Sequence, residues 1–521
     1  MITARELAGF ISLAAVLAFL LSCGTSGDYD RWNWGRWDAD RTGERLGAFG
    51  GLRQPEFNAK KLPDFGQYRA LRTLDEDEFP LDSPNRRVVF VGDIHGMYKP
   101  FNQLLDKIDY DSTNDVLIHT GDFLAKGQHH HSMATLEYMT THNITGVRGN
   151  HDQQILEWRG WISWICSSTE GCNWLKRIEH HWRVSHQGGS EPLQKDTELD
   201  EDLDEYLEAQ MQKAPSKDRR WWKLIPAGWK FLSGQYRIAR DMSKGQYEYL
   251  LQLPLALYVP HAHTFVVHAG ILPSDPRYPY DDAKRQPLAR IPDIFRSAEE
   301  DTPCVSGNGL MCTSHLRRVQ EMEILTDVPQ NKVPWTLMNI RGVKNGKVFR
   351  KYTGKYWAKL WNQEMGRCVG FTDERVLSSY VNEDSEEANK KKPKKVTLPC
   401  YPATVVYGHS ASRGLSPKRW SVGLDSGCVY GRKLTALVLG GPRLGSTEQW
   451  EIYEEDDEEG QEEAEYDDET FEANDDRVED SDSVGRRTNA NRWRRRKHKK
   501  DGDIVPFGDQ YKAKIISVKC R

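Results

Sequence analysis

The sequence predicts an α/β fold with a layered core. Three short segments, at residues 88–91, 116–118 and 143–148, are typical of strands, and Gly-Asp or Gly-Asn follows each of them directly or after two residues. The two segments between them carry apolar side chains at helical spacing. This strand-helix-strand-helix-strand order indicates a sheet that packs against helices.

The individual elements follow in order along the chain. Each predicted helix has an apolar face, made of Phe101, Leu104, Leu105 and Ile108 in the first and of Met133, Leu136 and Met139 in the second. Two further strands are predicted at 264–267 and 404–407, and a last hairpin-like run covers 420–439. Residues 86–440 are therefore expected to form the main domain.

The N-terminus carries a separate hydrophobic signal. Residues 8–22 are apolar apart from two serines, which fits the core of a signal peptide or a short membrane anchor, and both interpretations stay open for residues 1–23. Either one sends the rest of the chain into the secretory pathway, where disulfides form. Residues 24–85 have little periodicity and are predicted to be an irregular stem.

Composition indicates a largely globular chain with segments of unusual charge. Hydrophobic residues make up 38% and charged residues 29% of the sequence. Residues 153–260 are expected to be a helical, Trp-rich insertion or cap, and 383–398 a charged loop.

The C-terminal part, 441–521, is predicted to be a mostly disordered tail. Residues 451–500 hold 19 acidic and 10 basic residues, so the rest of the chain, whose overall net charge is −5, carries +4. The basic block at 492–500 is expected to be solvated, with contact to a polyanion or a membrane surface as the alternative.

The chain has nine cysteines. Proximity suggests the pairs Cys166–Cys172, Cys304–Cys312 and Cys368–Cys400, leaving Cys23, Cys428 and Cys520. Free buried thiols remain the alternative.

Five short motifs follow predicted strands. They are Gly92-Asp93-Ile94-His95-Gly96, Gly121-Asp122-Phe123, Gly149-Asn150-His151-Asp152, Val267-His268-Ala269-Gly270 and Tyr407-Gly408-His409-Ser410. Strand ends in an α/β sheet face one crevice, and glycine lets the chain turn sharply there. Asp, Asn and His without thiolates suit Mn, Fe or Zn. One such motif alone is usually a turn or a core histidine, but five in order predict a shared metal site.

These motifs resemble those of the calcineurin-like metallophosphoesterases, in particular the phosphoprotein phosphatase branch, from about residue 88 to 439. The resemblance implies a layered β-sandwich flanked by helices and two divalent metal ions, with zinc, manganese or iron as candidates. One metal would be held by Asp93, His95 and Asp122, and the other by Asp122, Asn150, His268 and His409. Two cations about 3.5–4 Å apart can clamp a phosphate and activate a water.

The same resemblance implies roles in catalysis and phosphate binding. His151 matches the family's catalytic histidine, a general acid, and Asp122 the bridging carboxylate. Asn150, Lys126 and Arg341 would contact the phosphate, although Lys126 stands where the family usually has Arg, which changes the geometry. The run His129 to His131 is predicted to be a solvated loop, with an accessory metal or phosphate contact as the alternative.

Two departures from the protein phosphatases bear on the substrate. Ala125 stands where those enzymes have an Asp that supports the catalytic histidine, and Asp152 stands where they have Glu. Ala125 and the stretch from Gly423 to Gly431 are similar to those of bacterial diadenosine tetraphosphate hydrolases. Both features favour phosphoanhydride cleavage.

The fungal vacuolar endopolyphosphatases are similar in Gly-Asp-Phe, Lys-Gly and Gly-Asn-His-Asp and join them to an N-terminal membrane segment. That resemblance implies cleavage of inorganic polyphosphate, zinc as the favoured metal and a vacuolar lumen or membrane location. The alternatives are a protein Ser/Thr or small-molecule phosphomonoesterase, a dinucleoside polyphosphate hydrolase, and a non-catalytic binding module. No specific nucleic-acid partner is expected.

Overall fold

Two six-stranded sheets form the centre of the protein. The computed structural model describes residues 62–186, 196–292, 309–372, 396–440 and 502–521. The first sheet has the strand order β1-β5-β6-β10-β12-β11. Its strands are β1 (Arg69–Thr73), β5 (Pro254–Val259), β6 (Thr264–Val267), β10 (Thr404–Tyr407), β11 (Ser416–Pro417) and β12 (Ser421–Gly423). β6, β10 and β12 are parallel neighbours, whereas β5 and β6 are antiparallel.

The second sheet has the order β14-β15-β13-β2-β3-β4. Its strands are β2 (Arg87–Val91), β3 (Asp115–His119), β4 (Thr145–Gly146), β13 (Lys433–Gly440), β14 (Ile504–Phe507) and β15 (Tyr511–Lys519). β2, β3 and β4 are parallel, and β13 runs antiparallel to both β2 and β15. The expected strands at 88–91 and 116–118 are thus confirmed, and the third is limited to two residues.

The two sheets pack face to face. Alternate side chains of a strand point to opposite faces of its sheet, so one strand contributes to two cores. Val88 and Phe90 of β2 belong to the core between the sheets, together with Val266 and Val406 of the first sheet. Val89 and Val91 belong instead to the core under the helices.

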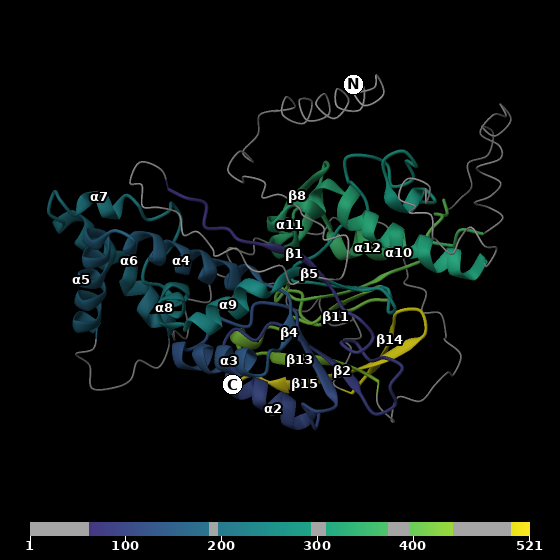
Figure 1. Ribbon diagram of the computed structural model, residues 1–521, viewed down its shortest axis with the longest axis horizontal. Coiled ribbons are helices and arrows are strands. Elements are labelled where there is room, and N and C mark those ends of the chain that lie inside the picture. Colours follow the sequence, from purple (N-terminus) through teal and green to yellow (C-terminus); the bar gives the residue numbers. More distant parts are fainter. Residues whose placement is uncertain (1–61, 187–195, 293–308, 373–395, 441–501) are drawn as a thin grey trace, which may run out of the picture. The chain divides into compact units, whose positions relative to one another are not determined.

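Helices cover the outer face of each sheet (Figure 1). α2 (Tyr98–Lys107) and α3 (His129–Thr141) lie over the second sheet. α10 (Gly309–Asp327), α11 (Pro334–Asn339) and α12 (Trp357–Met365) lie over the first. The predicted fold class, an α/β sandwich of sheets flanked by helices, is confirmed.

The expected helical insertion is present and reaches from the end of β4 to the start of β5. Its helices are α4 (Asn150–Cys166), α5 (Thr169–His186), α6 (Asp196–Lys213), α7 (Arg219–Trp222), α8 (Gly234–Asp241) and α9 (Lys244–Gln252). Trp158, Trp161, Trp164 and Trp174 are fully buried within it. The expected boundary at 260 is wrong, because Pro254–Val259 is strand β5 of the first sheet.

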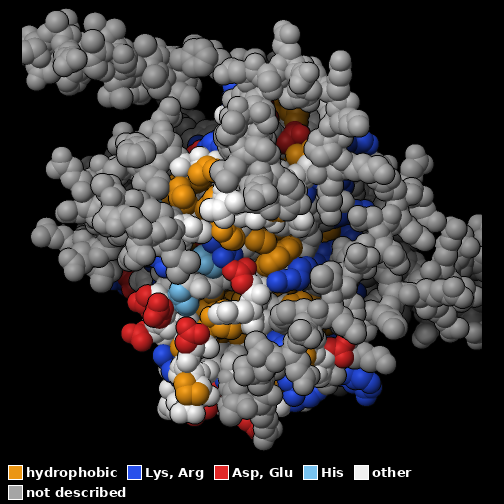
Figure 2. All heavy atoms as spheres, turned by 90° about the vertical axis from the view of Figure 1, so that its right-hand side faces the viewer, with side chains coloured by type: hydrophobic (Ala, Val, Ile, Leu, Met, Phe, Trp, Pro, Cys, Tyr) orange, Lys and Arg blue, Asp and Glu red, His pale blue; other side chains and the backbone are white. Residues whose placement is uncertain are grey.

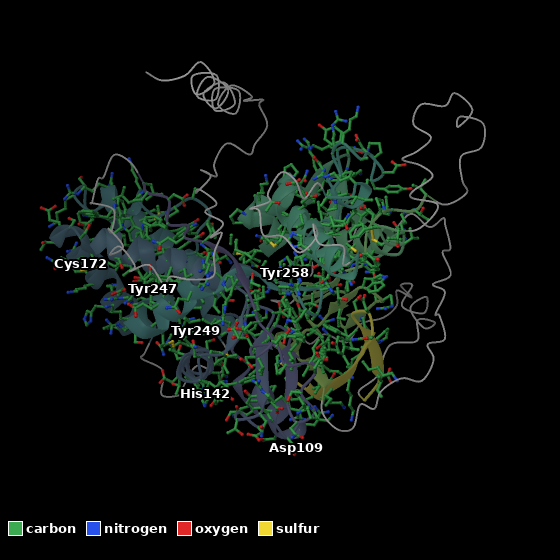
Figure 3. All side chains as sticks on the ribbon, turned by 45° about the vertical axis from the view of Figure 1, so that its right-hand side comes forward. Asp109, His142, Cys172, Tyr247, Tyr249 and Tyr258 are labelled. Atoms are coloured by element: carbon green, nitrogen blue, oxygen red, sulfur yellow. A yellow bond between two sulfur atoms is a disulfide. The ribbon has the colours of Figure 1, made fainter. Side chains whose placement is uncertain are left out.

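The hydroxyl group of Tyr249 connects the insertion to the second sheet through hydrogen bonds. Tyr249 of α9, labelled in Figure 3, donates to Ile144 O at 2.8 Å, and His119 Nε2 of β3 lies 3.3 Å from the same hydroxyl. The insertion therefore packs on the outer side of the second sheet, in the same hydrophobic cluster as α2 and α3.

Smaller elements complete the chain. A three-stranded sheet consists of β7 (Gly342–Lys344), β8 (Lys347–Phe349) and β9 (Lys355–Tyr356). The 3-10 helices are η1 (Pro287–Ala289), η4 (Pro329–Lys332) and η6 (Cys428–Tyr430).

Three expectations made along the chain are wrong. Within the stem, Arg69–Thr73 is strand β1, which pairs with β5. The run at 420–439 is not a hairpin, since β12 and β13 lie in different sheets. His129–His131 forms the first turn of α3 and not a loop, and His129 Nε2 lies 2.9 Å from Asp241 Oδ2.

The C-terminal boundary also differs from the expectation. β14 and β15 are strands of the second sheet, so residues 504–519 do not belong to a disordered tail. Their apolar side chains alternate, and Ala513 and Ile515 are fully buried between the sheets. The charged part at 451–500, the N-terminal segment 1–23 and most of the loop 383–398 lie outside the described residues.

Three disulfides occur in the described part of the chain. Cys166–Cys172 and Cys368–Cys400 confirm two expected pairs. Cys428–Cys520 was not expected, because the two residues are 92 positions apart. The suggested Cys304–Cys312 pair is not tested, because Cys304 lies outside the described residues.

On the face shown in Figure 2, the visible described residues include hydrophobic, basic, acidic and histidine side chains. Its large exposed hydrophobic side chains come from separate segments: Leu62, Val184, Met211, Tyr278 and Ile504. None of the described helices has the length and apolarity needed to cross a bilayer.

Candidate metal centre

The six predicted metal ligands follow the carboxyl ends of five strands from both sheets. Asp93 and His95 follow β2, Asp122 follows β3, and Asn150 begins α4 after β4. His268 and His409 follow β6 and β10 of the other sheet. Because parallel strands deliver their ends to one edge, the six residues converge although they span more than 300 positions.

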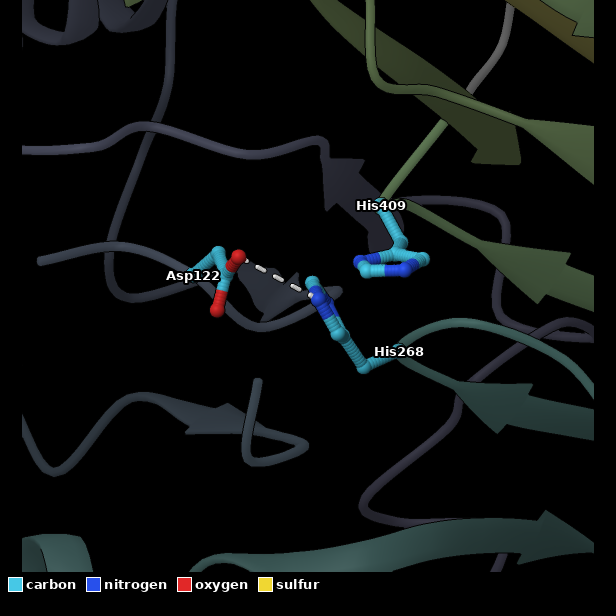
Figure 4. Close-up of side chains that lie close together, drawn as sticks. All are labelled: Asp122, His268 and His409. Carbon is cyan, nitrogen blue, oxygen red and sulfur yellow. Dashed lines mark ion pairs between the residues drawn. The ribbon is translucent and has the colours of Figure 1, made fainter. Parts of the chain in front are cut away.

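The carboxylate and imidazole groups form two sets that share Asp122. One set is Asp93, His95 and Asp122, the other Asp122, His268 and His409, and in each set the possible ligand atoms lie within 4.8 Å of one another. Asp122 Oδ2 is 3.3 Å from His268 Nε2 (dashed in Figure 4) and 3.9 Å from His95 Nε2. Asn150 Oδ1 lies 3.2 Å from His268 Nε2, so the amide joins the second set.

Backbone carbonyls orient two of the histidines. His268 Nδ1 donates to Thr120 O at 2.8 Å, and His95 Nδ1 donates to Leu124 O at 3.2 Å. Each ring therefore presents Nε2 to the centre as a lone-pair donor, which is the usual arrangement of a metal-bound histidine. The Nε2 atom of His409 is buried and has no hydrogen-bond partner within the described residues.

The carboxylates are held by backbone N–H groups. Asp152 Oδ2 accepts from the N–H groups of Asp122 and Gly149 at 2.8 and 3.0 Å, and the His151 N–H donates to Asp122 Oδ1 at 2.9 Å. The His409 N–H donates to Asp93 Oδ2 at 3.0 Å. These bonds fix the ligand oxygens before any cation binds.

Unusual backbone geometry gathers the ligands in a small volume. His95, Asp122 and His409 have φ of 49°, 49° and 66°, a left-handed conformation that costs free energy and that the surrounding structure must stabilise. A Cβ atom on Gly149 would lie 2.0 Å from Asp122 Oδ1, so glycine is required there for the close approach.

The electrostatics of the centre favour a cation. Burial raises the pKa of Asp93 well above its ordinary value, and the nearby Asp425 and Asp122 raise it further. Burial alone would raise the pKa of Asp122 as well, but His268 and His151 lower it well below the ordinary range. Burial lowers the pKa of His95 to about 4, so its ring is neutral and able to bind a metal.

The donor set therefore fits divalent ions. Buried carboxylates close together repel one another unless a positive charge lies between them. The unpartnered His409 nitrogen and the mixed oxygen and nitrogen donors match the preferences of zinc, manganese and iron.

A pocket opens beside the two sets. It is lined by Asp93, His95, Asp122, Lys126, Asn150, His151, Arg341, Arg350, His409, Ala411, Ser412, Asp425 and Tyr430. The residues predicted for phosphate binding and proton donation thus lie with the metal ligands, whereas His268 is fully buried behind them. Lys126 Nζ donates to Tyr430 OH at 2.8 Å, and Arg341 Nη2 donates to His409 O at 3.1 Å.

Sequence reasoning gave no role to several residues at this site. Asp425 and Tyr430 lie in the stretch from Gly423 to Gly431, whose resemblance was noted without a role for either side chain. Arg350 follows β8 and Gln235 lies in α8, and neither position has a motif that could have indicated it.

Residues 86–305 match the calcineurin-like phosphoesterase family. This region is therefore similar to the domain of that family. It contains the predicted ligands from Asp93 to His268, and the fold continues beyond it to pair β10, which His409 follows, with β6. The enzyme class expected from the sequence, a metal-dependent phosphoester or phosphoanhydride hydrolase, is the class of this family.

Similarity to curated proteins covers short segments. The chain is 46% identical over 68 residues to the symmetrical bis(5'-nucleosyl)-tetraphosphatase of Haemophilus ducreyi, and the match covers 13% of this chain and 24% of that protein. It is 31% identical over 93 residues to serine/threonine-protein phosphatase 1 of Salmonella typhimurium, covering 18% of this chain and 42% of that protein. The chain thus spans about a quarter of the length of the tetraphosphatase relatives it matches.

Solved structures are related only distantly. A crystal structure of a candidate diadenosine tetraphosphatase has 19% identity and a TM-score of 0.33, and the match covers 71% of this chain and 94% of that one. The similarity to the calcineurin-like phosphoesterase family is a similarity of sequence over residues 86–305.

Proposed function

We propose that the protein is a two-metal phosphohydrolase that cleaves phosphoanhydride bonds of inorganic polyphosphate. The observation that carries this proposal is the pair of Asp/His sets that share Asp122 at the base of a pocket bearing Lys126, Arg341 and Arg350. Such a pocket combines ligands for divalent cations with positive side chains for phosphate oxygens.

The residues that would hold the metals are those of the two sets, with Asn150 completing the second. When bound there, two divalent cations would lower the pKa of a water molecule and offset charge on the reacting phosphate. Zinc is the proposed metal, by resemblance to the endopolyphosphatases, and manganese and iron are the alternatives.

The chain's own side chains would bind the phosphate and transfer a proton. Lys126 and Arg341 are far apart in the sequence, but both line the pocket. They can contact oxygens of a phosphate that is bound at the metals. His151 would donate a proton to the leaving oxygen as the P–O bond breaks, and its ring would regain one from solvent. Burial holds the pKa of the free His151 ring well below its ordinary value, and the negative charge of a bound phosphate would raise it again.

Arg350 favours a substrate with more than one phosphate. It lines the pocket as a third cation, and its side chain is exposed at the rim, whereas Arg341 is buried. A single phosphate group needs fewer positive partners than a chain in which every phosphate is charged. Ala125, which stands where the protein phosphatases have an Asp, also supports an anhydride as substrate.

A dinucleoside polyphosphate is the second candidate substrate. The similarity to symmetrical bis(5'-nucleosyl)-tetraphosphatases favours it, although it concerns only 68 residues. Both candidates contain phosphoanhydride bonds and would use the same metal ligands.

We also propose a location in the secretory pathway, with the vacuolar lumen or membrane favoured. Three disulfides in the described residues support an oxidising compartment. Contact with a membrane would be made through residues 1–23, which lie outside the described residues.

The test is a substrate panel with defined metals. Protein loaded with zinc, manganese or cobalt is given polyphosphate, a dinucleoside tetraphosphate, a phosphopeptide and an aryl phosphate. Polyphosphate should shorten on a gel, Asp122→Asn should abolish the cleavage, and the exposed Asp77→Asn should behave as the wild type. If the dinucleotide or the phosphopeptide is turned over faster than polyphosphate, that compound becomes the proposed substrate. If none of the four compounds is turned over, the proposal that the protein is a phosphohydrolase is refuted.

A further inference from the structure

The catalytic histidine expected from the sequence has a hydrogen-bond partner that no motif indicates. Gln235 Nε2 lies 3.2 Å from His151 Nδ1, although the two residues are 84 positions apart. The amide N–H donates to Nδ1, so Nε2 is the ring nitrogen left to face the pocket that His151 lines.

Ala125 cannot hold the His151 ring by a hydrogen bond. Ala125, at the position where the protein phosphatases carry an Asp that supports their histidine, has φ of 68° and is 1% exposed. Its methyl group offers neither a hydrogen-bond donor nor an acceptor. Without another partner, the His151 ring would be held by its backbone N–H bond to Asp122 and by packing such as its edge-to-face contact with His95.

Helix α8 is fixed firmly enough to place Gln235. The neighbouring Tyr236 donates to Glu179 Oε1 of α5 at 2.6 Å, and Arg240 Nε donates to the same oxygen at 2.8 Å. At the end of the helix Asp241 Oδ2 lies 2.9 Å from His129 Nε2 of α3.

Helix α8 also packs against α4. Arg159 Nη1 donates to Ala239 O at 3.0 Å, and the Tyr236 ring packs edge-on against Trp158. α8 is thus anchored to three helices, including α4, which begins with the site residues Asn150 and His151. A side chain on such a helix is held more precisely than one on a loop.

We propose that Gln235 is a positioning residue for the hydrolytic reaction, which holds the His151 ring with Nε2 directed at the leaving oxygen. The inference rests on the proposed function, since it takes His151 as the proton donor. A glutamine amide can donate to Nδ1 of a neutral ring and, after rotation by half a turn, accept from Nδ1–H of a protonated ring. The helical insertion thereby supplies the hydrogen bond to the His151 ring that Ala125 cannot make.

The test compares Gln235→Leu and Gln235→Glu with the matched control Gln252→Leu, which makes the same change at an exposed position at the end of α9. Each protein is loaded with zinc and assayed with phenyl phosphate and 4-nitrophenyl phosphate. Phenolate is the poorer leaving group and needs the proton more, so kcat of Gln235→Leu should fall about tenfold or more for the phenyl ester, at nearly constant KM. The nitrophenyl ester should lose far less, Gln235→Glu should retain most of the wild-type activity, and Gln252→Leu should not differ from the wild type.

A second measurement does not depend on turnover. The ring nitrogens of ¹⁵N-labelled histidine are observed by NMR in the metal-free protein, and the His151 signals are assigned by their loss in His151→Asn. Gln235→Leu should move the His151 Nδ1 signal, whereas Gln252→Leu should leave it in place.

Equal losses of kcat for the two esters, or an unchanged His151 signal in Gln235→Leu, would overturn the positioning role. If wild-type protein cleaves neither ester nor any substrate of the panel, the proposed function fails, and the NMR signal still decides whether Gln235 binds the ring. Thermal unfolding midpoints of the variants exclude a general loss of folding, because Gln235→Glu and Gln252→Leu should match the wild type.

Discussion

Asp122 lies at the centre of the site because several groups hold it. Its backbone N–H donates to Asp152, its Oδ1 accepts from the His151 N–H, and its Oδ2 lies beside His268. It is also the one residue common to both Asp/His sets within the described residues. Substitution of this shared side chain should therefore weaken metal binding at both positions. Substitution of a residue that belongs to one set should weaken binding at one position.

Metal content tests this difference. Wild-type protein dialysed against zinc and desalted should retain about two ions per chain, His409→Ala about one, and Asp122→Ala less than one, because Asp122 supplies oxygens to both positions. Elemental analysis by mass spectrometry gives the ratio, with Asp77→Ala as the exposed control. Two retained ions in Asp122→Ala would contradict a shared carboxylate.

At the scale of elements, the second sheet depends on a strand from the far end of the chain. β15 pairs with β13 over seven residues, from Lys433 with Lys519 to Leu439 with Ala513. Lys107 of α2 donates to Ser517 O at 2.8 Å, and Cys428–Cys520 fixes the end of the strand. Removing β15 would expose the apolar face and the edge of β13, while the long charged segment before it contributes to no described pairing.

Two deletions in the same region should therefore differ sharply. Truncation after residue 500 should give insoluble or unfolded protein, although it removes the shorter segment. Deletion of 451–500 should leave the thermal midpoint and the activity near the wild-type values, since Leu439 pairs with Ala513 and Ile504 with Lys514, so both ends of the gap lie close together. The retained residues 441–450 and 501–503 are long enough to connect them at about 3.3 Å per residue.

Circular dichroism and thermal melts of both proteins check this prediction. A stable, soluble truncation product would show that β15 is dispensable. Loss of activity or of membrane and polyanion association in the 451–500 deletion would instead give the charged segment a role of its own.

At the scale of the whole molecule, buried acids occur in both helical layers. Glu157 of α4 and Glu364 of α12 have pKa values raised to about 7, chiefly by burial. In the unfolded chain the same carboxyl groups titrate near 4.5. The folded protein therefore binds more protons between these two values, and the free energy of unfolding falls as the pH rises through that window.

The double variant Glu157→Gln, Glu364→Gln should remove this dependence. Glutamine resembles the protonated acid and can still accept from Gln153 and Ser274. As the pH rises from 4.5 to 7, the free energy of unfolding of the wild type should fall by roughly 1 to 3 kcal/mol more per group than that of the variant. The difference should level off above pH 7. Urea unfolding at pH 5 and pH 8 measures it, with the exposed Glu76→Gln and Glu208→Gln as controls. Parallel pH profiles of wild type and double variant would show that these acids are not protonated in the fold.

The sequence by itself determined which residues end the strands and which chemistry they carry. Apolar runs followed by Gly-Asp or Gly-Asn are local signals, and so are helical spacing and short cysteine separations, because each depends on neighbouring positions. From these alone came the layered α/β core, the metal ligand candidates from Asp93 to His409, and the disulfides Cys166–Cys172 and Cys368–Cys400.

Only the tertiary structure decided which distant segments meet. It placed β1 and β5 in one sheet and β13 and β15 in the other, and it joined Cys428 to Cys520. It also brought Arg350 and Asp425 to the pocket and Gln235 to His151. Pairing across long separations depends on how whole faces pack and on the entropy of closing long loops, which no local pattern records. For that reason the resemblance of a short motif to a known family was enough to predict His151, whereas the amide that contacts its ring required the position of α8.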